Sequence, residues 1–306
     1  MTRIAFLGLG AIGAPMARHL AGAERSLTVW NRTQARAQAF CAETGATAAL
    51  TPAEAVANAD IVITCLPTSK DVASLLDGAD GVLATMKPGT AFVDCTSGDP
   101  ATSKRIAERL AERNIGYLDA PVSGGVAGAV AAKLTVMVGG DEALLERVRP
   151  TLEQFGARIV HCGAIGAGDA LKAVNNALLA MHIWGTAEGL VALEKMGVRS
   201  DVALDVINTS SGRSNASMNL FPERVLTRAF PRTFRLALLD KDVGIAADLA
   251  RDLDVPSPLI QLTSNLFRQA HHALGEEADH MEAVQVVEQQ SGAVVGQVAT
   301  ASGVGQ

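Results

Sequence analysis

Apolar runs and helical patterns alternate over the first half of the chain. Several runs are apolar at nearly every position, as is typical of parallel strands that are covered on both faces. These runs predict strands at residues 3–10, 27–32, 60–67, 90–97, 115–123, 133–141 and 157–163. Amphipathic segments such as 101–114 lie between them. The alternation therefore predicts a βαβ series that forms a doubly wound parallel sheet.

The pattern changes after Gly168, where the strand signals stop. Periodic apolar positions predict helices at residues 168–195, 200–208, 216–228, 240–253, 257–273 and 279–290. We therefore expect an α/β domain over 1–164 and an all-α domain over 165–290. The small, glycine-rich segment 291–306 is expected to be a flexible tail.

Charge and cysteine usage exclude several classes of function. The 306-residue chain carries 26 basic and 32 acidic residues, a net charge of −6, which argues against nucleic acid or an anionic membrane as a partner. Its four cysteines have no CxxC pair and no metal-ligand spacing, so we expect free thiols and no metal site. The N-terminus lacks the features of a signal peptide, and no apolar run reaches the length of a membrane span. A soluble, cytoplasmic protein is expected.

The segment GLGAIG follows the first predicted strand and opens a helix. Gly8 permits a tight turn, Gly10 lets a pyrophosphate approach the backbone, and Gly13 lets the helix pack closely on the strand. This context favours a Rossmann-type dinucleotide site over a merely structural glycine turn. The expected cofactor contacts in the turn are Gly8, Leu9, Gly10, Ala11, Ile12 and Gly13.

The end of the second predicted strand bears on which dinucleotide binds. An NAD site usually has an acidic residue there, which accepts a hydrogen bond from the ribose. This chain has Asn31, Arg32 and Thr33 instead. Without a carboxylate to repel it, a 2′-phosphate can pair with Arg32, which favours NADP, although NAD remains possible. The alternative is that Arg32 is a solvated loop residue.

Four segments together resemble the β-hydroxyacid dehydrogenase family, of the 3-hydroxyisobutyrate dehydrogenase and semialdehyde reductase type. They are the cofactor turn (4–20), a substrate-binding segment (119–140), a catalytic-helix segment (163–178) and KDVGIA (241–246). The resemblance covers nearly the whole chain. It implies an NADP-binding Rossmann domain followed by an all-α domain for substrate binding and dimerisation.

The chain departs from the family pattern near the cofactor. DCTS (94–97) stands where the family has Asp-x-Ser-Thr, so Ser97 lacks the methyl group of a threonine. AAKL (131–134) stands where a glycine often precedes the lysine. The resemblance places Leu66, Pro67, Ser97 and Lys241 at the cofactor.

Helix 168–195 carries Lys172, Asn175 and Asn176 on one face, although most of the helix is apolar. From the residues alone, the amine either reaches water from a core helix or serves proton transfer. The resemblance implies the second role: Lys172 is the acid/base at the substrate oxygen, and Asn176 holds both in place. Burial would lower the pKa of this amine from its usual value of about 10.4. Asn175 either faces the cofactor or satisfies backbone groups.

The segment PVSGG predicts the place where a substrate carboxylate binds. Ser123 and the backbone amides of Gly124 and Gly125 can cradle an anion, because successive N–H groups form a nest. An ordinary glycine turn after a strand is the alternative.

The helical half supplies the remaining candidates. We expect Lys241 and Asp242 to open a helix, and the resemblance puts Asp242 near the closed site; surface ion pairing is the alternative. Phe234 matches a cleft-lining aromatic residue of the family or is a core residue. In the polar segment 210–219, Arg213 either meets a second anionic group of the substrate or faces solvent.

These observations predict an NADP-dependent oxidoreductase that interconverts a small 3-hydroxy carboxylate and its semialdehyde. An imine reductase shares the scaffold but typically lacks the lysine. A catalytically inactive nucleotide-binding oligomerisation module is the alternative from another class. A 6-phosphogluconate dehydrogenase would need a longer helical domain. The apolar stripe of helix 168–195 and the family's pairing of such domains predict a homodimer or homotetramer.

Overall fold

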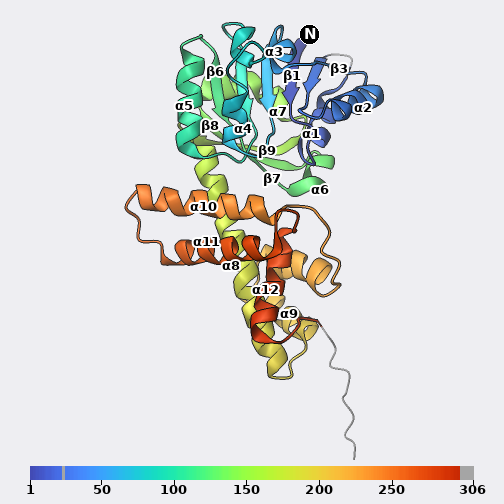
Figure 1. Ribbon diagram of the computed structural model, residues 1–306, viewed down its shortest axis with the longest axis vertical. Coiled ribbons are helices and arrows are strands. Elements are labelled where there is room, and N and C mark those ends of the chain that lie inside the picture. The colour runs from blue at the N-terminus through green and yellow to red at the C-terminus, as the bar shows by residue number, and fades with distance from the viewer. Residues whose placement is uncertain (23–24, 297–306) are drawn as a thin grey trace, which may run out of the picture. The chain divides into compact units, whose positions relative to one another are not determined.

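A computed structural model describes residues 1–22 and 25–296. Its contacts divide the chain into two units, Met1–Lys172 and Ala173–Gln306, each of which is described by itself (Figure 1). The division falls inside one long helix, and the domain boundary expected after residue 164 stays a prediction. Of the expected flexible tail, residues 297–306 lie outside the described residues.

The first unit is built on one sheet. Its strands are β1 (Thr2–Leu7), β2 (Arg25–Trp30), β3 (Thr47–Ala48), β4 (Ile61–Thr64), β5 (Ala91–Asp94), β6 (Gly116–Asp119), β7 (Val122–Ser123), β8 (Leu134–Gly140) and β9 (Gly156–Gly163). They follow the order β3-β2-β1-β4-β5-β6-β8-β7, with β9 also paired to β8. The first six are parallel neighbours, as expected of a doubly wound sheet.

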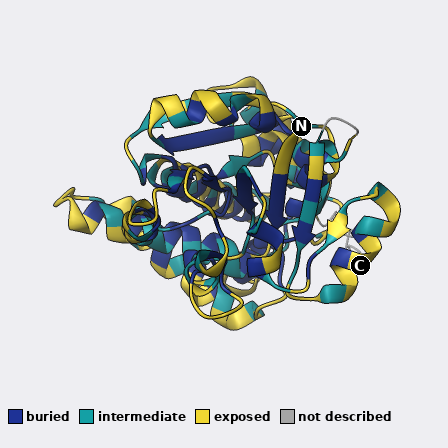
Figure 2. Cartoon of the chain, turned by 90° about the horizontal axis from the view of Figure 1, so that it is seen from above, coloured by how far each residue is buried: buried dark blue, intermediate teal, exposed yellow. Residues whose placement is uncertain are grey.

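Helices cover both faces of this sheet, so its central strands β1, β4, β5 and β6 are buried on both sides over most of their length (Figure 2). They are α1 (Gly13–Leu20), α2 (Gln34–Thr44), α3 (Pro52–Val56), α4 (Ser69–Ser74), η1 (Val82–Ala84), α5 (Pro100–Ala111), α6 (Gly125–Val130) and α7 (Glu142–Leu152). Alternate residues of β1 enter different cores: Ile4 and Phe6 pack with α1, α2 and α7, whereas Ala5 and Leu7 pack with α3, α4 and α5. This two-sided burial explains the continuous apolar runs in the sequence.

The structure corrects two details of the sheet. The segment 115–123, expected as one strand, forms two strands, β6 and β7. The pairing of β6 with β5 ends at Asp119, and Pro121, which has no N–H to donate, lies between the two strands. In addition, β8 runs antiparallel to both β6 and β7, so this end of the sheet is mixed rather than parallel.

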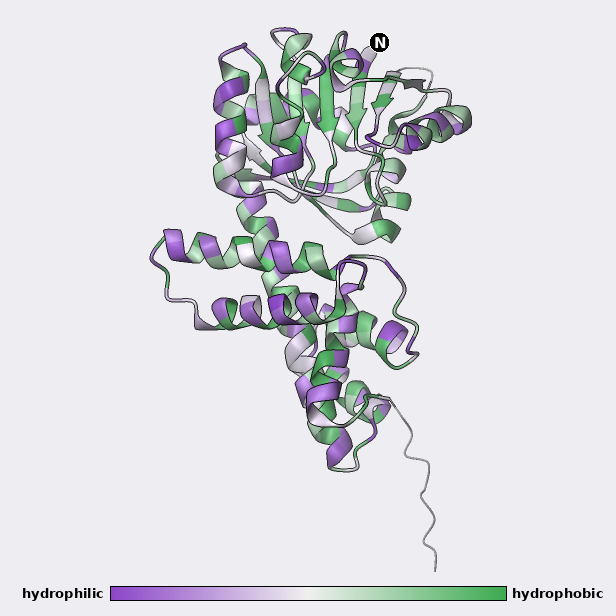
Figure 3. Cartoon of the chain, viewed as in Figure 1, coloured by the Kyte–Doolittle hydropathy of each residue, from purple (hydrophilic) through white to green (hydrophobic). Residues whose placement is uncertain are grey.

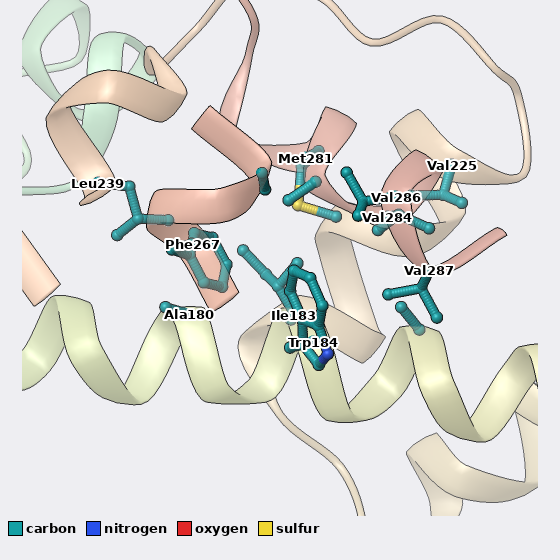
Figure 4. Packing of buried hydrophobic residues seen from close by; sticks show 14 of the residues in the cluster. Ala180, Ile183, Trp184, Val225, Leu239, Phe267, Met281, Val284, Val286 and Val287 are labelled. Carbon is teal, nitrogen blue, oxygen red and sulfur yellow. The ribbon is translucent and has the colours of Figure 1, made fainter. Parts of the chain in front are cut away.

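The second unit is helical and is built around the long helix α8. Its elements are α8 (Ala167–Lys195, which begins in the first unit), α9 (Ser200–Thr209), η2 (Ala216–Val225), α10 (Leu236–Asp252), α11 (Pro258–Leu274), η3 (His280–Glu282) and α12 (Ala283–Ser291). On α8, Ala180, Ile183 and Trp184 point into a core that includes Phe267 and Met281 (Figure 4). Hydrophilic and hydrophobic residues alternate along α10 and α11, as is typical of amphipathic helices (Figure 3). The expected fold class, a Rossmann-type sheet followed by an all-α region, is confirmed.

Two predicted helices differ from expectation. Residues 216–225 form a π-helix, with Leu226 N–H bonded to Phe221 O at 3.0 Å. Pro222 lies inside it, and proline lacks the N–H and the clearance that an α-helix needs. Helix α10 begins at Leu236 rather than at 240, so Lys241 and Asp242 lie in its second turn and do not open it.

Among the described residues, no helix is both long and apolar enough to cross a membrane. The same part of the chain holds no group of three or more side chains arranged to bind a metal ion. All four cysteines are free thiols, as expected.

Candidate functional site

The turn between β1 and α1 has the geometry that a dinucleotide requires. Gly8 has φ +107°, and a Cβ there would lie 2.4 Å from the carbonyl oxygen of Cys65. A Cβ at Gly13 would lie 2.1 Å from the carbonyl oxygen of Gly8. In contrast, a Cβ at Gly10 would meet no atom within 4 Å. Gly8 and Gly13 are therefore demanded by the fold, whereas the open space at Gly10 leaves room for a phosphate group.

The start of α1 is also prepared for an anion. Its first turn contains no acidic residue, and no side chain caps it. Leu9 is buried, and its N–H donates to Asn31 Oδ1 at 2.9 Å, so Asn31 holds the turn in shape. Ala11 is exposed and Ile12 half-buried at the tip. Helix N–H groups and an uncapped N-terminus fit a bound pyrophosphate.

Arg32 and Thr33 lie beside the end of β2. The Arg32 side chain is 84% exposed, and its Nη1 lies 3.8 Å from Asp71 Oδ1. Thr33 is the N-cap residue of α2 but makes no capping hydrogen bond, and the first turn of α2 has no acidic residue. Asp71, in α4, was missed by sequence reasoning because it is distant in the chain. The end of β2 itself has no carboxylate, as the sequence shows, but the Asp71 carboxylate of α4 lies near Arg32.

The ends of β4 and β5 form a hydrogen-bonded layer next to this turn. Buried Asp94 accepts from Thr64 Oγ1 at 2.7 Å and from Thr96 N at 3.0 Å. Thr96 Oγ1 in turn accepts from Leu66 N at 3.1 Å. Burial raises the pKa of the Asp94 carboxyl. This network fixes the backbone of Leu66 and Thr96. Their neighbours Pro67 and Ser97 are exposed and half-buried, respectively.

The expected carboxylate cradle lies between β7 and α6. Gly124 and Gly125 have φ +135° and +64°, positive values that glycine adopts and side chains disfavour. A Cβ at Gly125 would meet nothing within 4 Å, and half-buried Ser123 ends β7 beside it. His19 Nε2 bonds to the carbonyl oxygen of Ala129 at 3.0 Å, which holds the far end of α6.

Helix α8 carries buried polar side chains on its otherwise apolar body. Lys172 is 9% exposed, and Asn176, one turn later, is 3% exposed. Asn175 Nδ2 donates to Asn176 Oδ1 at 3.1 Å. This contact gives Asn175 a partner in a side chain rather than in a backbone group.

The structure links Asn176 to α10, a contact that the sequence did not reveal. Asn176 Nδ2 donates to Asp242 Oδ2 at 2.6 Å, and Lys241 Nζ lies 3.0 Å from Asp242 Oδ1. Asp242 is 2% exposed. The pair is therefore not a surface ion pair: Asp242 is a buried hydrogen-bond acceptor that orients the Asn176 amide. Sixty-six residues separate the two partners in the chain, and no local pattern signals their contact.

Phe234 lies in the segment before α10 and packs against the helical core. Buried Asp279 accepts from the N–H groups of Thr233 and Phe234 at 2.9 and 3.0 Å. The rings of Phe234 and His280 are 5.4 Å apart. Burial raises the pKa of Asp279, but the His280 contact and the two N–H groups more than offset this and hold that pKa well below its usual range. Arg213 is exposed.

Comparison with known proteins gives the family. The family model "NAD binding domain of 6-phosphogluconate dehydrogenase" matches residues 3–163, and "NAD-binding of NADP-dependent 3-hydroxyisobutyrate dehydrogenase" matches residues 166–287. The fold and the glycine turn define a dinucleotide-binding protein, and the two family models make it an oxidoreductase that uses a nicotinamide cofactor. The chain belongs to the β-hydroxyacid dehydrogenase family, as the sequence motifs predicted.

Relatives cover nearly the whole chain. The 2-(hydroxymethyl)glutarate dehydrogenase of Eubacterium barkeri is 37% identical over 96% of this chain and 97% of its own. The NAD-dependent L-serine dehydrogenase of Pseudomonas aeruginosa is 38% identical over 88% and 92%. The structure of Mycobacterium tuberculosis 3-hydroxyisobutyrate dehydrogenase with L-serine has a TM-score of 0.85 at 35% identity and covers 94% and 99%. An imine reductase from Streptomyces aurantiacus, at 21% identity and a TM-score of 0.62, shares the fold alone.

Proposed function

We propose that this protein interconverts a small 3-hydroxy carboxylate and its semialdehyde, with NADP preferred over NAD. The names of the three relatives support the substrate class. 2-(Hydroxymethyl)glutarate, L-serine and 3-hydroxyisobutyrate all contain the unit HOCH2–CHX–COO⁻ and differ only in X. The group X is apolar, cationic or anionic in these compounds, so the CH2OH and COO⁻ groups are the shared features for recognition.

The observation that carries the proposal is the pair of buried polar side chains on α8, Lys172 and Asn176. A buried amine and a buried amide on one helix face can serve proton transfer to and from a substrate oxygen. A nicotinamide cofactor, when bound, exchanges a hydride with the substrate carbon. Lys172 Nζ takes the hydroxyl proton during oxidation and returns it during reduction. Asn176, with one N–H bonded to Asp242, uses its other N–H to hold the substrate oxygen.

The remaining contacts divide between carboxylate and cofactor. Ser123 Oγ and the N–H groups of Gly124 and Gly125 bind the substrate carboxylate. Arg32 and Thr33 bind the 2′-phosphate of NADP at the uncapped start of α2, where Arg32 exchanges Asp71 for the phosphate. Lys241 adds a contact to the cofactor.

We also propose that the chain works as a homodimer or homotetramer. The helical unit leaves Leu178 of α8 and Val202 and Val206 of α9 exposed by 49%, 49% and 57%. Light scattering at micromolar concentration tests this, and a monomer contradicts it.

The test of the proposed reaction is turnover with a panel of acids in which X is varied, using NADP⁺ and NAD⁺, with a cyclic imine and NADPH as a further arm. In Lys172→Ala, kcat should fall by about 10²–10⁴-fold while NADPH binding survives. Lys172→Arg should restore little, because a guanidinium does not act as a base near neutral pH. Lys195→Ala, which removes an exposed lysine from the same helix, is the matched control and should leave kcat unchanged.

Three results would contradict the proposal. Undiminished turnover in Lys172→Ala would mean that another group carries the proton. Equal loss of turnover and NADPH binding would make Lys172 a folding residue. Cofactor binding without turnover on any substrate would favour an inactive nucleotide-binding module.

A further inference from the structure

Two buried carboxylates converge on the first turn of α8, just before Lys172. Asp119, at the end of β6, is 1% exposed. Its Oδ1 accepts from Gly166 N at 2.7 Å and its Oδ2 accepts from Asp169 N at 3.0 Å. The N–H groups at a helix start have no partner within the helix, and a negative charge there is favourable. Asp119 therefore fastens the start of α8 to the sheet.

Asp169 belongs to this first turn itself, and its side chain accepts hydrogen bonds from another part of the first unit. It is also 1% exposed, and its Oδ1 accepts from Gly98 N at 3.0 Å. Ser103 Oγ, on α5, lies 2.6 Å from its Oδ2. Gly98 follows Ser97, which the family resemblance places at the cofactor. Asp169 thus ties the start of α8 to the loop after β5.

The backbone leaves no room for this turn to shift toward the sheet. A Cβ at Gly168 would lie 2.3 Å from the Met137 carbonyl oxygen and 2.9 Å from Asp119 Oδ2. A Cβ at Gly139 would lie 2.5 Å from Asp119 Oδ1. Glycine at these positions is therefore required by the close approach of α8 and β8 to the Asp119 carboxylate.

From this geometry we propose that Asp119 and Asp169 are positioning residues for Lys172. They clamp the first turn of α8 between β6 and the loop after β5, and so set where the Lys172 amine stands relative to the cofactor end of the sheet. Lys172 follows Asp169 by three residues, one turn along the same helix, so a displacement of the clamped turn displaces the amine. This inference rests on the proposed proton-transfer role of Lys172.

The two carboxylates differ in what can replace them. Both oxygens of Asp119 face N–H donors, so an asparagine would turn its own NH2 toward one of them. Asp169 faces one N–H and one hydroxyl, and a hydroxyl can accept as well as donate. An asparagine at 169 can therefore keep both hydrogen bonds. Geometry predicts that Asp119→Asn breaks the clamp and that Asp169→Asn preserves it.

The pKa shifts of Asp119 and Asp169 are consistent with the expectation that asparagine can replace Asp169. Burial raises the pKa of both carboxyls, and the charge of Asp119 raises that of Asp169 further. Asp94 on β5, which also faces Asp169, acts in the same direction, and Ser103 and the Gly98 N–H act against it. A protonated Asp169 has the same donor and acceptor pattern as asparagine.

A double-mutant cycle tests the proposal on the full chain. Asp119→Asn, Asp169→Ala and Asp169→Asn are each measured alone and combined with Lys172→Ala, using the best substrate of the panel. The readouts are kcat, NADPH dissociation constant and Tm on the same preparation. Asp141→Asn is the matched control: Asp141 caps α7 through Leu144 N at 2.7 Å, and asparagine caps a helix equally well.

We expect Asp119→Asn and Asp169→Ala to lower kcat by about 10–100-fold with little change in NADPH binding, because a small misplacement of a catalytic group has this cost. Asp169→Asn should recover most of the loss, and Asp141→Asn should show none. In the Lys172→Ala background the same clamp substitutions should have almost no further effect on kcat, because they act through the amine that has been removed.

Two results would overturn the inference. Equal factors in both backgrounds would show that the carboxylates act on the fold or cofactor and not through Lys172. Unchanged kcat in both clamp variants would show that the turn needs no clamp. If Asp119→Asn does not fold, the cycle with Asp169→Ala decides alone. A Lys172→Ala variant with full turnover would refute the proposed function itself, whereas additivity refutes only the positioning role.

Discussion

Asp242→Ala is the substitution that most directly tests the link between α10 and α8. It removes the acceptor of the Asn176 amide at 2.6 Å and the partner of Lys241 at 3.0 Å. Asn176 is 3% exposed, so its N–H loses a partner where water does not reach it. Lys241 has 22% of its side chain exposed and can turn to solvent.

The size of the effect follows from this asymmetry. A buried donor left without a partner, as the Asn176 amide would be, costs about 1–3 kcal/mol. Loss of the ion pair of Lys241 adds little to this cost, because the lysine can turn to solvent. We therefore expect the free energy of unfolding to fall by about 2 kcal/mol and Tm by about 4–8 °C. Because the freed amide no longer has one orientation, kcat should also fall, by about tenfold or more.

Thermal unfolding and steady-state kinetics measure both effects, and Asp248→Ala is the matched control. Asp248 lies on the same helix and pairs with Arg251 at 2.7 Å, but the two side chains are 66% and 63% exposed. Such a surface pair contributes at most about 1 kcal/mol and touches no site residue. Asp242→Asn should lie between the two alanine variants, since its amide oxygen can still accept from Asn176. If Asp242→Ala and Asp248→Ala have the same Tm and the same kcat, the hydrogen bond between Asp242 and Asn176 contributes neither to stability nor to catalysis.

Two further predictions concern charged side chains, one at the end of β2 and one at the start of α8. Arg32→Ala should raise the KM for NADPH and leave the KM for NADH nearly unchanged. Asp71→Asn should lower the KM for NADPH, because it removes the carboxylate that pairs with Arg32. Equal effects on both cofactors would refute the pairing of Arg32 with the 2′-phosphate. Burial raises the pKa of the Asp169 carboxyl in the folded state. The protonated carboxyl therefore contributes its full stabilisation below the pKa of the unfolded chain, about 3.9, and this stabilisation is lost as the pH rises through the pKa of the folded state. Asp169→Asn should therefore gain stability relative to wild type as pH rises in urea titrations, and a constant difference would contradict the assignment.

The sequence predicted the fold class and the cofactor turn because both depend on local patterns. Two-sided burial of parallel strands produces continuous apolar runs, and the run that ends at Leu7 meets glycines at the spacing that a tight turn and close helix packing demand. The periodic stripe of α8 predicted its bounds to within a residue. Family resemblance then named Lys172 and Asn176, which the apolar pattern alone left ambiguous.

Interruptions of a pattern were predicted less well. The sequence reads 115–123 as one strand and 216–228 as one ordinary helix. In the structure Pro121 separates β6 from β7, and Pro222 lies within a π-helix. Each proline removes one N–H, but the backbone that accommodates it depends on the neighbours it packs against.

The sequence by itself thus determined where strands, turns and the polar face of α8 lie, since hydrophobic periodicity and glycine stereochemistry act over a few residues. Only the tertiary structure decided which side chains meet. Asp242 reaches Asn176 across 66 residues, Asp119 reaches the start of α8 across 47 and 50, and Asp71 comes near Arg32 from a separate helix. Hydrogen bonds and charges act over a few ångströms of space, and folding brings distant segments within that range. No spacing along the chain encodes these contacts.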